Sequence, residues 1–339
     1  MRLGSATVSV LLFIPWFRAE AWMIPLPGGH HLPIQPFGLL VATGVMLGYK
    51  LGERRAKQVG LDPLVYADLV AHILVGGFVA GHVLDAIGYH PEQVADDFHQ
   101  IVNGTFWADA EDGIRFPYTL KLWAGLSSMG GFTGAALGSI VWKLRRKVPL
   151  IAVNDVVIWA LPFGWIFGRT GCFVVHDHPG VVTNFFLAVA DYQVGYPPYQ
   201  PRHDLGLYEI LWCAAVLPLL WWLQYKKLPR GFFLGLIPVL YAPVRFGLDF
   251  LRASPEELGD HADPRYFGLT PAHYASLALL VVGLAFFWRV YKGPAIELPE
   301  SARWSPEKEA ARNAIAEQDA TKKDGKGGGS DKARKKPRR

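Results

Sequence analysis

The chain has 339 residues, of which 51% are apolar and only 19% are charged, and its formal net charge at pH 7 is +5. A soluble domain usually carries about a quarter charged residues, so the composition excludes an ordinary soluble protein. The apolar residues form continuous blocks of about twenty, long enough to cross a bilayer as helices and unlike the alternating strands of a membrane barrel. We therefore expect an all-α, polytopic membrane protein.

The first 22 residues contain a short apolar run, Val8 to Phe17, preceded by Arg2. The run is too short to span a bilayer, and no clean small-residue cleavage site follows it. Because Met23 opens the next segment, we interpret residues 1–22 as a misannotated leader. The membrane domain is then expected over residues 23–292.

Seven apolar segments follow in chain order, each bounded by charged residues, proline or glycine. We predict spanning helices near residues 36–52, 64–88, 122–142, 150–175, 205–225, 232–251 and 271–291. The second segment is the least typical, because it contains Asp68, His72 and His82.

Basic residues alternate between the loops that join these segments. The loops after the first, third and fifth segments are basic, with Lys50, Arg54, Arg55, Lys57, Lys143, Arg145, Arg146, Lys147, Lys226, Lys227 and Arg230. The intervening loops contain few basic residues, and basic loops remain in the cytoplasm. This pattern predicts seven transmembrane helices in the bacterial inner membrane, with a periplasmic N-terminus and a cytoplasmic C-terminus.

The C-terminal tail, residues 293–339, contains twelve basic and eight acidic residues and ends in a low-complexity run. Such a composition predicts a disordered, basic cytoplasmic tail. Attraction to anionic lipids accounts for its charge more simply than nucleic-acid binding, so we expect no nucleic-acid partner.

Polar residues are predicted to gather where the segments reach the periplasmic side. The topology brings to this depth Gly130, Gly131, Arg169, Glu209, Tyr241, Arg245, Asp249 and Arg252. Arg245, Asp249 and Arg252 are spaced four and three residues apart, so they share a helix face, where Asp249 can pair with either arginine. A structural ion pair is one interpretation of that face.

The surplus of positive charge favours a second interpretation. Three arginines face two carboxylates, Asp249 and Glu209, in a region of low dielectric. Arg169 lies between glycines, which allow a ligand or backbone to come close. Guanidinium groups suit phosphate, so we expect a phospholipid head group to bind here.

Several motifs resemble the prolipoprotein diacylglyceryl transferase family. They are PIQPFGLL at 33–40, GGFTG at 130–134, GRTGCF at 168–173, RHDLGLYE at 202–209 and YAPVRFGLDFLR at 241–252. The resemblance covers roughly residues 23–292. It implies transfer of the diacylglyceryl group of phosphatidylglycerol to the lipobox cysteine thiol of a prolipoprotein, so the expected partners are phosphatidylglycerol, prolipoprotein signal peptides and membrane lipids.

The resemblance also implies roles for individual residues. Arg169 matches the arginine that contacts the lipid phosphate. Asp249 stands where the family usually has glutamate. The other matching positions are Gly168, Gly171, His203, Tyr208, Glu209, Tyr241 and Arg245.

The resemblance is that of a divergent member. Cys172 replaces the signature asparagine, and residues 176–178 read HDH where the family has asparagine and glutamate. Met129 replaces a histidine, and Phe37 replaces the tyrosine of the first segment. The candidate base of the third segment is therefore absent.

The substrate thiol needs help to ionise, because its reference pKa is about 8.5. We expect His176 or His178 to act as general base, with His203 as a third candidate. Two alternatives are a polar turn without catalytic function and a metal bound by the histidine pair with Asp177, His203 or Asp204. We expect the protein to bind neither a metal nor a cofactor.

Two other functions compete with the transferase. One is a catalytically altered relative that acts as a lipid-binding or assembly protein. The other is a small-solute transporter, which would be expected to contain paired repeats that the sequence does not display.

Overall fold

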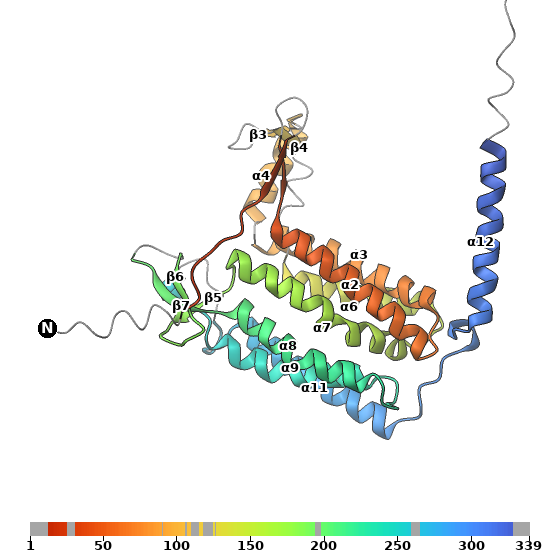
Figure 1. Ribbon diagram of the computed structural model, residues 1–339. Coiled ribbons are helices and arrows are strands. Elements are labelled where there is room, and N and C mark those ends of the chain that lie inside the picture. The colour runs from red at the N-terminus through yellow and green to blue at the C-terminus, as the bar shows by residue number, and fades with distance from the viewer. Residues whose placement is uncertain are drawn as a thin grey trace, which may run out of the picture.

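The computed structural model describes residues 13–25, 31–89, 91–105, 107–109, 115–117, 125, 127–193, 198–258 and 265–327. Each of the seven predicted segments contains a long helix. These helices are α2 (Pro36–Gln58), α3 (Pro63–Tyr89), α6 (Ser128–Arg145), α7 (Leu150–Val175), α8 (Leu205–Leu223), α9 (Phe232–Asp249) and α11 (Pro271–Lys292). They lie alongside one another in a bundle (Figure 1). Residues 122–124 and 126 of the third predicted segment lie outside the described residues.

Within the described residues, five helices are long and apolar enough to cross a membrane, namely α3, α7, α8, α9 and α11. The other two long helices, α2 and α6, are not among these five, and each carries basic residues in its last turn. The structure is that of an all-α, multi-pass membrane protein. The short strands described below lie outside the bundle.

Small residues allow the helices to approach closely. A Cβ atom built on Gly134 of α6 would lie 2.0 Å from the carbonyl oxygen of Gly76 on α3, and one on Gly44 of α2 would lie 2.5 Å from that of Gly164 on α7. In a membrane, such contacts between backbones replace the hydrophobic driving force that lipid cannot provide. The α3–α6 and α2–α7 pairs therefore depend on glycine.

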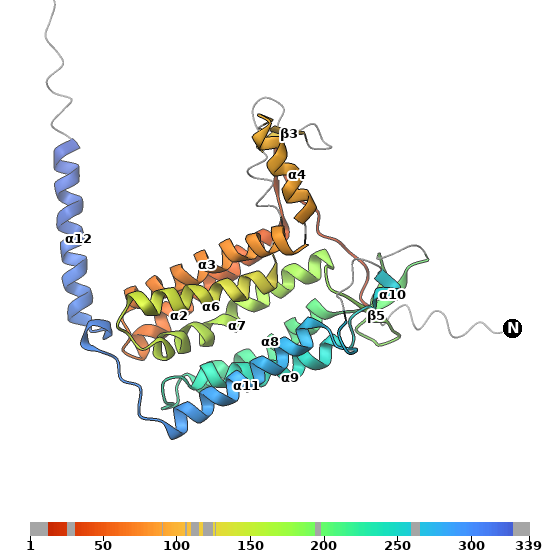
Figure 2. The same cartoon turned by 180° about the vertical axis from the view of Figure 1, so that it is seen from behind.

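Helix α7 joins the two halves of the bundle. The helices α2, α3 and α6 lie on one side of it, and α8, α9 and α11 lie on the other (Figures 1 and 2). Several short elements gather at the end where α7 finishes. They are α4 (Pro91–Val102), α10 (Pro255–Leu258), the hairpins β1 (Trp22–Pro25)–β2 (His31–Ile34) and β3 (Trp107–Asp109)–β4 (Arg115–Pro117), and a three-stranded sheet.

The three-stranded sheet covers this end of the bundle. Its antiparallel strands lie in the order β5 (Pro179–Val182), β7 (Gln200–Asp204), β6 (Val189–Tyr192). The Val181 amide donates to the Leu251 carbonyl at 2.8 Å, which joins β5 to the chain after α9. Strand β7 runs directly into α8. The sheet therefore holds the ends of α7, α8 and α9 together.

The predicted leader contributes to this end of the molecule. The Ile14 amide donates to the Ala188 carbonyl at 2.9 Å, and the Ala19 amide donates to the Val174 carbonyl at 2.9 Å. Residues 14–19 thus lie between strand β6 and the end of α7. The earlier residues of the predicted leader, 1–12, lie outside the described residues.

The tail differs from the disorder predicted for residues 293–339. It contains the short helix η2 (Glu300–Ala302) and the helix α12 (Pro306–Gly327), which extends away from the bundle at its other end (Figure 1). Alanine, glutamate and lysine in α12 have high helix propensity. The Arg312 guanidinium donates to Asp62 Oδ1 at 2.9 Å and anchors the start of α12 to the bundle. Residues 328–339 lie outside the described residues.

Candidate active site

The end of α7 reverses the chain and builds one wall of the site. His176 follows α7 in the left-handed conformation (φ 52°, ψ 47°), and its amide donates back to the Cys172 carbonyl. The Asp177 amide also reaches that carbonyl, at 3.4 Å. This reversal satisfies carbonyl groups that the helix end leaves free. It places Asp177 and His178 beside the last turn of α7.

His176 is buried in a hydrogen-bonded cluster. Its Nδ1 lies 2.8 Å from Asp204 Oδ2, and its Nε2 lies 2.6 Å from the Phe17 carbonyl oxygen. The Trp16 ring stacks on the imidazole with the ring centroids 4.4 Å apart. A carbonyl only accepts, so Nε2 carries a proton. With both nitrogens engaged by acceptors, His176 has no nitrogen available to a substrate thiol.

Asp204, the partner of His176, also contacts the start of α8 and the sheet. Its Oδ1 accepts from the Leu207 amide at 3.1 Å and so caps α8. Its Oδ2 also accepts from the Tyr192 hydroxyl at 3.3 Å. The His176–Asp204 pair therefore joins the end of α7, the sheet and the start of α8.

A second cluster forms around Glu209, whose side chain is 2% exposed. Arg169 Nε lies 2.8 Å from Glu209 Oε2, and the Tyr241 hydroxyl donates to the same oxygen at 2.7 Å. Trp165 Nε1 donates to it at 3.3 Å, and the Arg169 guanidinium lies 4.7 Å from the Trp165 ring centroid. Helices α7, α8 and α9 thus each contribute to one hydrogen-bonded group.

A third cluster centres on Asp249, which is fully buried. Arg245 Nη1 donates to Asp249 Oδ1 at 2.7 Å, and Arg252 Nη1 lies 3.9 Å from the same atom. Asp249 thus lies close to both arginines, as predicted, but Arg252 follows the end of α9 and does not share its helix face. The Thr270 hydroxyl donates to Asp249 Oδ2, and His273 Nδ1 lies 3.3 Å from it. Asp249 therefore orients the arginines and attaches α9 to the start of α11.

His178 faces the arginines of these clusters. Partial burial, with the guanidinium groups of Arg169 and Arg252, lowers the pKa of His178 to about 3. So weak a base accepts a proton poorly from a thiol whose pKa is about 8.5. The contacts of His176 do not favour it as the general base, and the lowered pKa of His178 does not favour that residue; the assignment of either histidine remains a prediction.

Three potential metal ligands lie together at the same place. One ligand atom each of Cys172, Asp177 and His178 lies within 4.8 Å of the other two. Arg169 Nη1 lies 3.8 Å from Cys172 Sγ. The group differs from the metal alternative that the sequence suggested, because His176 pairs with Asp204 instead of with His178, and Cys172 takes part.

The remaining predicted site residues have separate environments. A Cβ on Gly171 would lie 2.8 Å from the Phe37 ring, and one on Gly130 would lie 2.5 Å from the Ala80 carbonyl oxygen, so both glycines allow helix packing. Nothing lies within 4 Å of a Cβ on Gly168 or Gly131. His203 Nδ1 contacts the Tyr208 hydroxyl.

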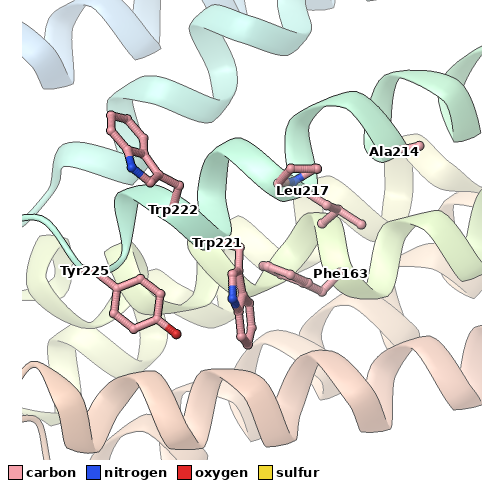
Figure 3. A pocket seen from close by; sticks show the side chains of 7 residues that line it. Phe163, Ala214, Leu217, Trp221, Trp222 and Tyr225 are labelled. Atoms are coloured by element: carbon pink, nitrogen blue, oxygen red, sulfur yellow. The ribbon is translucent and has the colours of Figure 1, made fainter.

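An apolar groove lies at the other end of α8. It has a volume of about 540 Å³ and is lined by Phe163, Ala214, Leu217, Pro218, Trp221, Trp222 and Tyr225. Figure 3 shows these side chains along α8 and the facing surface of α7. The lining carries no carboxylate, guanidinium or imidazole group, so the ionisable site described above lies elsewhere.

Comparison with known proteins identifies the family. The family model described as prolipoprotein diacylglyceryl transferase matches residues 28–289. The chain belongs to the prolipoprotein diacylglyceryl transferase family.

Among relatives named phosphatidylglycerol–prolipoprotein diacylglyceryl transferase, the protein of Nitratidesulfovibrio vulgaris is 30% identical over 270 residues, covering 76% of this chain and 91% of the relative. The protein of Chromohalobacter salexigens is 28% identical over 253 residues, covering 74% and 85%. The match to the family model includes every site residue predicted from the sequence, so those residues lie within the shared domain of the transferase family.

Several site residues of this family member were missed by sequence reasoning. Trp165 stands four residues before Arg169, a spacing that places both on one helix face and could have been recognised. Thr270 precedes Pro271 at a helix start, which is a capping pattern. No sequence pattern indicated Phe17 or Trp16 as site residues, because their role depends entirely on the folded position of His176.

Proposed function

We propose that this chain transfers the diacylglyceryl group of phosphatidylglycerol to the lipobox cysteine thiol of prolipoproteins. Membership of the transferase family supports the reaction. The observation that carries it is the Arg169–Glu209–Tyr241 group, which three helices assemble beside Arg245 and Arg252. A buried cation held in one orientation suits the phosphate of a lipid substrate.

The proposed setting is the bacterial inner membrane. All seven long helices cross it, with the N-terminus periplasmic and the C-terminus cytoplasmic, because the basic loops alternate along the chain. The arginine clusters then lie at the periplasmic side, where an exported prolipoprotein arrives. Residues 23–292 form the membrane domain in this proposal.

The roles of the residues follow from the charges that change in the reaction. The thiol sulfur bonds to the glyceryl carbon that carries the phosphate ester, the carbon–oxygen bond breaks, and glycerol phosphate leaves with the electron pair. Negative charge therefore develops on the phosphate, and Arg169 and Arg245 stabilise it. Glu209 and Asp249 orient these arginines, while Tyr241 and Arg252 complete the binding surface. Gly168, with open space beside it, leaves room for the lipid.

Complementation tests the proposal. The chain should rescue a conditional bacterial mutant that lacks its own transferase, and membranes from the rescued cells should modify a lipobox peptide. The Arg169→Ala variant should fail to rescue. The matched control is Arg146→Ala, because Arg146 pairs with Asp68 elsewhere on the bundle. Failure of the unaltered chain, when present in the membrane, would favour the lipid-binding or assembly function instead.

A further inference from the structure

The group of Cys172, Asp177 and His178 has the composition of a metal site. Thiolate, carboxylate and imidazole are the side chains that bind zinc, and a site with three protein ligands keeps its fourth position open. The ligand atoms lie within 4.8 Å of one another. Around zinc, with bonds of about 2.0–2.3 Å, they would lie about 3.5 Å apart. Rotation of the partly exposed Asp177 and His178 side chains would have to close that difference.

The backbone already holds the three residues near this arrangement. Cys172 belongs to the last turn of α7, and the left-handed His176 turns the chain so that the next two residues face it. His176 is itself held by Asp204 and by the Phe17 carbonyl. Cys172 is buried, whereas the side chains of Asp177 and His178 are 42% and 26% exposed. The sulfur therefore lies at the bottom of a group that opens outward.

We propose that Cys172, Asp177 and His178 bind Zn²⁺, and that the open position takes the thiol of the incoming lipobox cysteine. The inference rests on the proposed function and adds the missing step of thiol activation. Coordination to zinc deprotonates a thiol. Zinc thus takes the place of a general base. Met129 stands where the resembling family has a histidine, both ring nitrogens of His176 contact acceptors, and His178 is a metal ligand in this proposal.

The neighbouring charges suit this arrangement. One Zn²⁺ with the Cys172 thiolate, the Asp177 carboxylate and the neutral His178 ring carries no net charge. Binding the substrate thiolate makes the group negative, and Arg169 Nη1 lies 3.8 Å from Cys172 Sγ. The arginine therefore favours the thiolate-bound state over the empty one.

The proposed reaction is balanced in atoms and charge. The lipobox thiol loses its proton to water when its sulfur binds the metal. The sulfur then forms its bond to the glyceryl carbon, and the phosphate leaves with the electrons of the broken carbon–oxygen bond. The thioether product carries no charge, so it binds zinc more weakly than the thiolate and departs.

Metal binding is tested on the full-length chain in detergent, with Zn²⁺ and Co²⁺ as the probes. Elemental analysis should find about one zinc per chain, and Co²⁺ should produce a sulfur-to-cobalt charge-transfer absorption. Cys172→Ser should abolish that absorption, and His178→Ala should weaken it. Cys213→Ser is the matched control, since Cys213 is the other buried cysteine, and should retain the absorption. An absorption that is absent from the unaltered chain, or unchanged in Cys172→Ser, would overturn the site.

The activation step has its own test. At pH 7 only about one thiol in thirty is ionised unaided, so removing zinc with a chelator should slow transfer to a lipobox peptide by up to about thirtyfold, and added Zn²⁺ should restore it. Undiminished transfer by the zinc-free protein would refute activation by metal. If no transfer occurs with or without zinc, the proposed transferase function fails, and the cobalt spectrum still decides the metal site.

Discussion

At the scale of residues, the site separates into groups that position and groups that face the substrate. Glu209 and Asp249 are buried acceptors that each hold an arginine. His176 and Asp204 are buried together and join three elements. Arg169, Arg245 and His178 retain partial exposure. These three partly exposed side chains are the ones expected to contact the lipid and the peptide.

Replacing either phosphate-binding arginine should reduce transfer severely. We expect Arg169→Ala and Arg245→Ala each to lower the rate by about two orders of magnitude or more, because each removes a preorganised charge. Arg169→Lys should recover only part of the loss, since an ammonium lacks the planar fork that binds Glu209 and phosphate. The measurement is the initial rate with a lipobox peptide in membranes, normalised to the amount of variant present. Near-normal rates for both alanine variants would contradict the assignment.

His176 provides a different prediction, because its role in the structure is to hold the fold. His176→Gln should destabilise the protein by about 1–3 kcal/mol, the cost of leaving a buried hydrogen-bonding group without its partner. Transfer should fall by the same factor at pH 7 and at pH 9. A general base would behave otherwise, because the thiol ionises unaided at high pH and the defect would then shrink. Thermal unfolding in detergent and rates at the two pH values distinguish the roles.

At the scale of elements, glycine determines which helices pair. The Gly134 and Gly138 positions of α6 leave no space for a side chain, because a Cβ would lie 2.0 Å and 2.2 Å from carbonyl oxygens of α3. Helix α7 contacts both halves of the bundle and ends in the site. Displacing α6 would thus disturb packing without removing any charged group of the site.

Gly134→Leu should therefore destabilise the bundle. Forcing a side chain into that contact should cost about 1–3 kcal/mol or more, as overpacking does. Gly88→Leu is the matched control, because Gly88 lies on α3 with nothing within 4 Å of its Cβ position, and its effect should stay within about 0.5 kcal/mol. The measurement is the melting temperature of each variant in the same detergent. Equal melting temperatures would show that the α3–α6 contact is not limiting.

At the scale of the whole molecule, the two ends of the bundle differ in chemistry. One end carries the sheet and the clusters around Glu209 and Asp249. The opposite end carries the basic loops and α12, which Arg312 attaches through Asp62. A bilayer with anionic lipid at its cytoplasmic face favours one orientation of such a molecule.

Topology reporters test that orientation. A reporter fused after Arg146 should read as cytoplasmic, and one fused after Tyr199 should read as periplasmic, because these positions lie at opposite ends of the bundle. Paired fusions to a periplasm-active enzyme and a cytoplasm-active fluorophore provide the measurement. The reverse pattern would move the arginine clusters to the cytoplasmic side, away from an exported thiol.

Much of the architecture was predictable from the sequence. The predicted segments at 150–175 and 205–225 correspond to α7 and α8 within two residues at each end, because apolar runs bounded by charge mark helices in any membrane. The tail was less predictable. Its composition is that of a disordered segment, whereas the structure has α12 there, starting beside a contact between residues 62 and 312 that no local pattern indicates.

For the site, sequence by itself predicted which charged residues gather at one end of the bundle, since chain direction and helix period decide the end and the face. Only the tertiary structure decided their partners. Arg169 pairs with Glu209 across two helices, and His176 pairs with Asp204 instead of with His178. Partner choice depends on side-chain distances of a few ångströms between elements far apart in the chain. Those distances are fixed by packing across the whole bundle, which no local pattern encodes.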